Sequence, residues 1–121
     1  HFDASTAIEL PKDDDVSAGL AAYQSEEYWY FLGAHRDGGE INVFLEKTIG
    51  GKTERIAEQK IPRASELKFK ITGEARAYSF FYDAGDQGWT ALKEGDDGTI
   101  LSTEVAGGFV GAVIGPYARA D

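Results

Sequence analysis

The sequence predicts an all-β fold, an antiparallel β-sandwich of the jelly-roll type that forms a single domain over residues 1–121. Apolar and polar residues alternate with the two-residue period of a strand along most of the chain. Turn residues recur about every 8–12 positions, as in sandwiches and barrels. No segment carries a 3.6-residue apolar stripe with caps at both ends. Many short strands between regular turns favour two packed sheets.

The opening strand has Phe2 and four further residues on one face, and Pro11 with the charged run 12–15 ends it. Further strands are expected at residues 17–24, 28–35, 41–47, 53–60, 67–71, 77–83, 89–92, 99–102 and 109–118. Segment 28–35 is apolar on both faces, which predicts a central strand.

Turn chemistry supports these boundaries. Gly38-Gly39 and Gly50-Gly51 predict tight hairpins, because a primed turn needs positive φ at its centre. Asp96-Asp97-Gly98 is expected to turn the chain before the short strand at 99–102. A single helical turn is expected over residues 64–67, and nothing longer.

Charge and composition exclude several partner classes. The formal net charge is −9 and the basic residues form no stripe, so neither nucleic acid nor an anionic membrane surface is an expected partner. No apolar run approaches the roughly 20 residues of a membrane helix. The chain contains no cysteine, which excludes disulfides and thiolate metal sites. This composition predicts a soluble domain, leaves cytoplasmic and secreted locations both open, and suits a neutral polysaccharide ligand.

Residues that could carry catalysis or bind metal are dispersed. Glycoside hydrolysis uses two carboxylates about 5–10 Å apart, but the acidic residues lie mostly in expected turns and form no E-x-E pattern on a strand. No catalytic residue is therefore assigned, and no cofactor is expected. Asp13 and Asp15 are the calcium candidates, because clustered oxygen ligands suit Ca²⁺. A charged turn that protects a sheet edge is the favoured account of the same run.

Aromatic residues are the strongest candidates for a binding site, because sugar rings stack on aromatic rings. In a strand, odd and even positions face opposite ways, so Tyr28 and Tyr30 share one face while Trp29 and Phe31 share the other. One of the two sets must be core. The stacking residues predicted here are Tyr28, Tyr30 and Trp89, with Arg36 and Asp37 as polar neighbours.

Five segments together resemble a known family in order along the chain. They are residues 18–23 (AGLAAY), 28–37 (YWYFLGAHRD), 78–82 (YSFFY) with Trp89, 100–104 (ILSTE) and 108–115 (GFVGAVIG). The sequence resembles the C-terminal concanavalin A-like β-sandwich domain of glycoside hydrolase family 43 enzymes, the β-xylosidases and α-L-arabinofuranosidases.

The resemblance implies that catalysis belongs to a separate five-bladed β-propeller, which the sandwich supports. In the β-xylosidases a loop of the sandwich brings an aromatic residue to the active-site pocket, and Phe109 matches that residue by motif. Two departures are Val110 in place of Thr and a shorter loop between Glu104 and Phe109. Some of these domains also bind xylan, so Phe109 joins the stacking candidates.

The resemblance covers the later part of a longer family domain, so the opening strands of that domain are expected to be absent. A propeller, a preceding segment or another chain is then the expected partner of the uncovered edges. Two alternatives remain open: a stand-alone jelly-roll glycoside hydrolase, and a structural domain whose aromatic residues are all core. The sequence does not decide between a xylosidase and an arabinofuranosidase parent.

Overall fold

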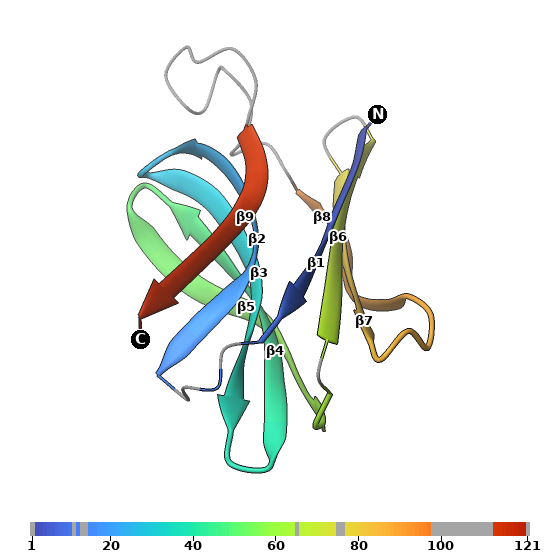
Figure 1. The fold of residues 1–121 in the computed structure, drawn as a ribbon. Helices are drawn as coiled ribbons and strands as arrows, with labels where there is room; N and C mark the ends of the chain where they lie inside the picture. The colour runs from blue at the N-terminus through green and yellow to red at the C-terminus, as the bar shows by residue number, and fades with distance from the viewer. Residues whose placement is uncertain are drawn as a thin grey trace.

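A computed structural model describes residues 2–10, 12, 15–64, 66–74, 77–97 and 113–120. Within these ranges the regular elements are all β-strands, arranged as two antiparallel sheets that face each other (Figure 1). The strands are β1 (Phe2–Glu9), β2 (Val16–Ser25), β3 (Tyr28–Asp37), β4 (Glu40–Ile49), β5 (Lys52–Pro62), β6 (Glu66–Glu74), β7 (Ala77–Ala84), β8 (Thr90–Asp97) and β9 (Val113–Ala120). The predicted β-sandwich is confirmed. No helix of the described ranges has the length and apolarity of a membrane span.

The strand order brings distant parts of the chain together. One sheet runs β1-β6-β7-β8, and the other runs β5-β4-β3-β2-β9. Strand β3 is the central strand of the five, as its apolar faces predict. Strand β9 pairs with β2 in a register that joins Val16 to Ala120. The end of the chain therefore completes a sheet that its first third begins.

Both glycine hairpins form as predicted. Asp37 pairs with Glu40, and Gly38 between them has a φ of 63°. The second two-residue loop contains Gly50 and Gly51, with φ values of 60° and 81°. Positive φ at both central residues is the signature of a type I′ turn, which matches the twist of the strands.

Two local expectations are wrong. The helical turn over residues 64–67 does not form, because β6 begins at Glu66 and its ladder with β1 starts there. Asp96 and Asp97 belong to β8 rather than to a turn, since they pair with Tyr78 and Ala77 of β7. The expected strand at 99–102 and the first part of the one at 109–118 lie outside the described residues.

The core lies between the two sheets and takes alternate residues from each strand. Strand β6 contributes Leu67, Phe69 and Ile71, all fully buried, while Lys68 and Lys70 face outward. The other sheet contributes the even residues of β3 and the odd residues of β4 to the same cluster. Further members of this cluster are Leu20, Ala22, Tyr30, Leu32, Ala34, Ile41, Val43 and Leu45 from the five-stranded sheet, and Phe80 and Tyr82 from β7 of the four-stranded sheet.

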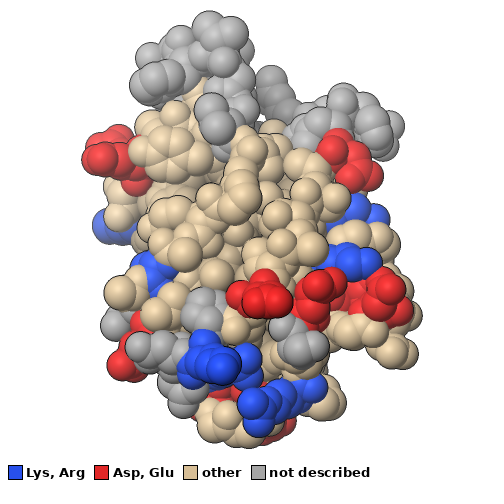
Figure 2. All heavy atoms as spheres, in the orientation of Figure 1, with Lys and Arg blue, Asp and Glu red and all other residues tan. Residues whose placement is uncertain are grey.

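The sheet edges differ in how they are protected. Strands β1 and β9 are edges that contact each other at the front of Figure 1. On this side of the molecule, uncharged side chains fill the upper centre and charged ones gather in the lower half (Figure 2). Edge strand β9 contains Pro116, which has no N–H to donate. Edge strand β5 exposes five charged side chains, whereas β1 exposes Ser5 and Ala7 between two acids.

Candidate functional site

The outer face of the five-stranded sheet, the face that points away from the core, carries a cluster of aromatic residues. Strand β3 places Trp29 and Phe31 there, because the even residues of that strand fill the core. The pairing of β3 with β2 sets Tyr23 of β2 opposite Trp29. The pairing of β2 with β9 sets Tyr117 of β9 opposite Gly19 of β2. Three strands thus bring together four rings from opposite ends of the chain.

The rings meet mostly edge to face. The ring centroids of Tyr23 and Trp29 are 6.0 Å apart with an interplanar angle of 62°, and those of Trp29 and Tyr117 are 5.3 Å apart at 77°. The Tyr117 ring is also nearly perpendicular to Phe31, at 4.9 Å and 86°. Edge-to-face pairs are favourable for the ring quadrupoles. Neither tyrosine lies flat on the indole, whereas the Phe31 ring is nearly parallel to it, with centroids 6.2 Å apart at an angle of 20°.

A cavity of about 520 Å³ opens between these rings, and we call it the aromatic pocket. Tyr23 and Tyr117 are each 38% exposed, so the pocket is open to solvent. Ala21 and Gly115 face each other across the β2–β9 ladder at its floor, where their small size leaves room. The lining residues are Ala21, Tyr23, Glu26, Trp29, Gly115, Pro116 and Tyr117. The described lining is therefore largely apolar, and its one carboxylate, Glu26, lies at the β2–β3 turn.

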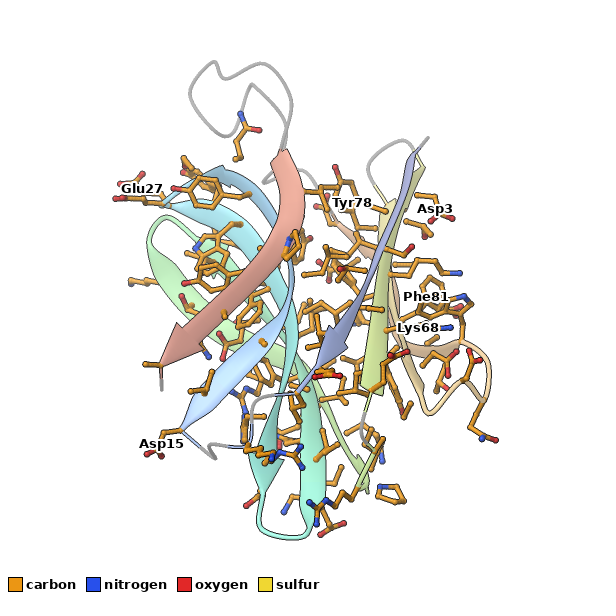
Figure 3. The ribbon with its side chains drawn as sticks, in the orientation of Figure 1. Asp3, Asp15, Glu27, Lys68, Tyr78 and Phe81 are labelled. Carbon is orange, nitrogen blue, oxygen red and sulfur yellow. The ribbon has the colours of Figure 1, made fainter. Side chains whose placement is uncertain are left out.

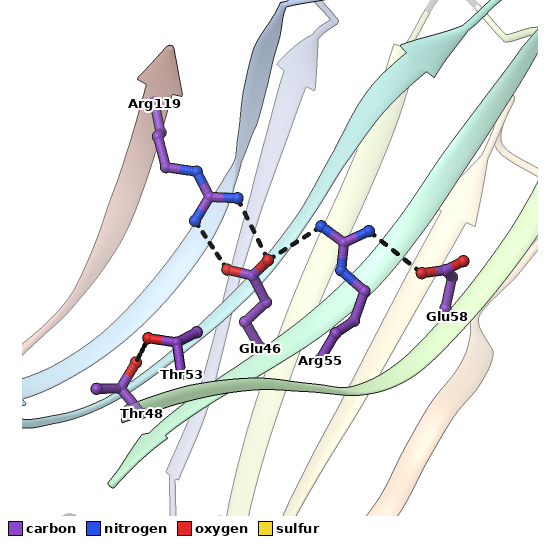
Figure 4. Close-up of polar contacts among 6 residues, drawn as sticks. All are labelled: Glu46, Thr48, Thr53, Arg55, Glu58 and Arg119. Carbon is purple, nitrogen blue, oxygen red and sulfur yellow. Dashed lines mark hydrogen bonds and ion pairs between the residues drawn. The ribbon is translucent and has the colours of Figure 1, made fainter. Parts of the chain in front are cut away.

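An ion cluster centred on the buried carboxylate of Glu46 lies on the same face and contacts Phe31 and Phe44. Figure 4 shows its polar contacts. Glu46 accepts a bidentate pair of bonds from Arg119, at 2.7 and 3.3 Å, and a third bond of 3.0 Å from Arg55. The Arg55 guanidinium also lies 4.1 Å from the centre of the Phe44 ring. The two arginines thereby cover Phe31 and Phe44, which are buried although they point outward.

Electrostatics fix the charge state of this cluster. Burial raises the pKa of Glu46, but the hydrogen bonds and charges of Arg119 and Arg55 outweigh it and hold that pKa below its usual range. The carboxylate is consequently ionised at neutral pH and engaged on both oxygens. It holds two arginines in place, and neither guanidinium lines the aromatic pocket.

The structure places Tyr30 in the core. Its side chain is fully buried, and Tyr30 Oη lies 2.6 Å from Asp96 Oδ2 and 2.9 Å from the Asp97 carbonyl oxygen. Lys47 Nζ approaches the same carboxylate at 2.8 Å. Burial, followed by the hydrogen bond and charge of Asp96, raises the pKa of Tyr30 well above its usual range. This tyrosine ties β3 to β8 inside the sandwich.

Three other predicted residues lie at different ends of the five-stranded sheet. Tyr28 is half-buried and packs against the core, on the same face of β3 as Tyr30. Arg36 donates to the Leu10 carbonyl oxygen at 3.3 Å and lines a separate shallow cavity. Asp37 is exposed and pairs with Lys60 at 3.2 Å. None of them lines the aromatic pocket.

Trp89 lies on the opposite sheet, just before β8. Its ring is 42% exposed, and Lys70 Nζ lies 4.7 Å from its centre. The same ammonium lies 4.7 Å from the ring of Phe81, which Figure 3 shows on the outer side of the four-stranded sheet. The structure does not bring Trp89 together with the other predicted stacking residues. Phe109 lies outside the described residues.

Only one of the two calcium candidates lies within the described residues. Asp15 is exposed next to β2, and Asp13 lies outside the described residues. Among the residues that are described, no three His, Cys, Asp or Glu side chains gather in a way that could hold a metal ion. A calcium site at Asp13 and Asp15 stays a prediction.

The sequence did not predict the pocket residues Tyr23, Trp29 and Tyr117. The two-residue period showed that Trp29 and Tyr30 face opposite ways, but both faces of β3 are aromatic, so the period alone could not tell which face is core. Tyr117 lies at the end of an apolar run and reaches the pocket only through the pairing of β9 with β2.

Comparison with known proteins shows where this fold occurs. The family model of the β-xylosidase C-terminal concanavalin A-like domain matches residues 1–121. The chain is 28% identical over 112 residues to a non-reducing end α-L-arabinofuranosidase of Bacteroides ovatus, covering 93% of this chain and 21% of that enzyme. A solved family 43 structure from a capybara gut metagenome is 29% identical, with a TM-score of 0.89 over 97% of this chain and 23% of its own.

A xylan β-1,4-xylosidase from Bacillus halodurans shares the fold at 17% identity, with a TM-score of 0.79 over 98% of this chain and 24% of its own. The chain thus spans between a fifth and a quarter of the relatives that it matches. Because the family model matches the whole chain, the expected resemblance is confirmed. The chain belongs to the family of β-xylosidase C-terminal concanavalin A-like domains.

Proposed function

We propose that this chain is the non-catalytic accessory module of a family 43 glycoside hydrolase, and that its parent enzyme is an α-L-arabinofuranosidase. The observation that carries the proposal is the match of the whole chain to a C-terminal domain that makes up about a fifth of its relatives. The arabinofuranosidase is 28% identical to this chain, whereas the xylosidase named above is 17% identical. The module supports a catalytic propeller and binds xylan-type oligosaccharides.

The carboxylates of the described residues support a non-catalytic role. A glycosidase needs one carboxylate to protonate the leaving oxygen and a second to act as nucleophile or base. Within the described lining of the aromatic pocket, Glu26 is the one acidic side chain. Glu46 is buried but is held ionised by two arginines, and Asp83 accepts the backbone N–H groups of Gln87 and Gly88. Neither is placed as a general acid.

The proposal is tested with 4-nitrophenyl α-L-arabinofuranoside and 4-nitrophenyl β-D-xyloside. Residues 1–121 alone should hydrolyse neither substrate, and the parent enzyme should hydrolyse the arabinofuranoside with the higher kcat/KM. Hydrolysis by the chain alone that is lost on mutation of its carboxylates would establish the stand-alone hydrolase instead. A parent enzyme that prefers the xyloside would identify a β-xylosidase.

A further inference from the structure

We infer that the aromatic pocket is a subsite for a neutral oligosaccharide, in which a sugar ring stacks on Trp29 between Tyr23 and Tyr117 while Glu26 accepts a hydroxyl hydrogen. The inference deepens the proposed function by assigning the binding residues. It differs from the arrangement that the sequence suggested, because the ring that faces the ligand is the indole of Trp29 rather than the phenol of Tyr30.

The shape of the pocket fits a small ligand with apolar faces. Its volume of about 520 Å³ lies within the range of about 300–1,000 Å³ typical of small-molecule sites. The walls are rings held edge to face, and the floor is made by Ala21 and Gly115. A Cβ built on Gly115 would meet no atom within 4 Å, so the space above this glycine is empty. A pyranose ring, whose C–H groups form an apolar face, can lie against such walls.

The charges around the pocket select a neutral ligand. No lysine or arginine belongs to its described lining, and the nearby Arg55 and Arg119 are both engaged by Glu46. A ligand that carries carboxylates or phosphates would therefore meet Glu26 without a compensating cation. Tyr23 and Tyr117 each present a phenol that is partly exposed and can hydrogen-bond to a hydroxyl. A sugar, which carries hydroxyl groups around an apolar ring face, matches this combination of aromatic walls, two phenols and one carboxylate.

The test measures binding of xylohexaose and of cellohexaose to residues 1–121 by calorimetry, and of arabinoxylan by affinity electrophoresis. Trp29→Ala should weaken oligosaccharide binding at least tenfold, because it removes the stacking surface. Gly115→Val should weaken it by a similar factor while leaving the fold intact, since it fills the empty space above the floor.

Each variant has a matched control. Trp89→Ala removes an exposed tryptophan of the opposite sheet, and Gly39→Val adds a side chain at a glycine that likewise has no atom within 4 Å of a built Cβ. Both controls should change binding less than twofold. The far-UV and near-UV circular dichroism of every variant should match that of the original chain.

Three outcomes would overturn the inference. They are failure of the original chain to bind any of the three glycans at millimolar concentration, binding that survives Gly115→Val, and loss of binding in Trp89→Ala alone. A pocket that docks another part of the parent enzyme would show itself differently: Gly115→Val would then lower the thermal stability of the parent without affecting glycan binding by residues 1–121. The hydrolysis assays stand apart from all of these results, so the accessory role can hold where the subsite fails.

Discussion

Glu46 shows how one side chain organises the outer face of the five-stranded sheet. Its side chain is 11% exposed, and it is the shared partner of Arg55 and Arg119. Each arginine lies over a phenylalanine ring, so the carboxylate also fixes the cover of the outward-facing aromatic residues. Removing one partner from a buried charge cluster is costly because the others keep their charge.

Glu46→Gln should lower the free energy of unfolding by about 1–3 kcal/mol at pH 7. The folded pKa of Glu46 is lowered, so its contribution is present above the unfolded pKa of about 4.3 and is lost as pH falls through the folded value. The difference between the two proteins should therefore shrink toward pH 3. Urea denaturation at pH 7 and pH 3 measures it.

Glu58→Gln is the control, because that exposed carboxylate contacts Arg55 alone among the described ion pairs. It should cost less than about 0.5 kcal/mol. A Glu46→Gln effect of the same size at both pH values would contradict the role of the ionised carboxylate.

We expect Tyr30 to make the stability of the domain depend on pH in the alkaline range as well. Its pKa is raised by burial and by Asp96, so the stability it contributes is present below the unfolded pKa of about 10 and is lost as pH rises above it. Tyr30→Phe should cost about 1–3 kcal/mol at pH 7, because Asp96 loses a charge-assisted hydrogen bond. The variant should also lose less stability than the original chain between pH 9 and pH 11, measured by chemical denaturation.

Tyr23→Phe, which alters an exposed tyrosine, should leave both the stability at pH 7 and the alkaline profile unchanged. If the original chain and Tyr30→Phe lost stability equally between pH 9 and pH 11, the loss would arise from a group other than Tyr30.

Among the strands, β2 and β3 approach each other closely at Gly19 and Gly33. A Cβ built on Gly19 would overlap the Leu32 carbonyl oxygen and lie 2.6 Å from Gly33 Cα, both backbone atoms that cannot rotate away. Gly19→Ala should therefore destabilise the domain by about 2 kcal/mol or more. Gly115→Ala, in open space on β9, should change stability by less than about 0.5 kcal/mol. Thermal unfolding of the two variants would refute this if Gly19→Ala were the milder change.

The sequence predicted the existence and order of the described strands well, because hydrophobic period and glycine turns are local signals. The ends of β8 were not predicted, since Asp96 and Asp97 resemble turn residues and become strand through their pairing with β7. The local pattern also could not show which face of β3 is buried. Trp29 and Tyr30 are both large aromatics, and the buried partner Asp96 that claims Tyr30 is 66 residues away. Contacts between residues far apart in the sequence therefore decide which of two similar aromatic faces is buried.

At the scale of the whole molecule, β9 connects the end of the chain to its first third. It covers one side of β2 and carries Tyr117 and Arg119, which pack on Phe31. A chain that stops after residue 112 should lose cooperative unfolding and near-UV circular dichroism, and should bind a hydrophobic dye. A cooperative transition with the original midpoint would show that β9 is dispensable.

The unequal protection of the sheet edges decides where the molecule is open to pairing with another chain. Proline in β9 and the charges of β5 discourage an added strand, whereas Ser5 and Ala7 of β1 present a neutral backbone edge. The other edge of the four-stranded sheet, β8, exposes the charged Glu94 and Asp97. When residues 1–121 are concentrated by themselves, growth of this sheet should therefore start at β1. Ala7→Lys should slow light scattering at high concentration, and Gln59→Lys at an exposed position of β5 should not. Storage behaviour of the isolated domain would then be set by the residue chemistry of a single strand.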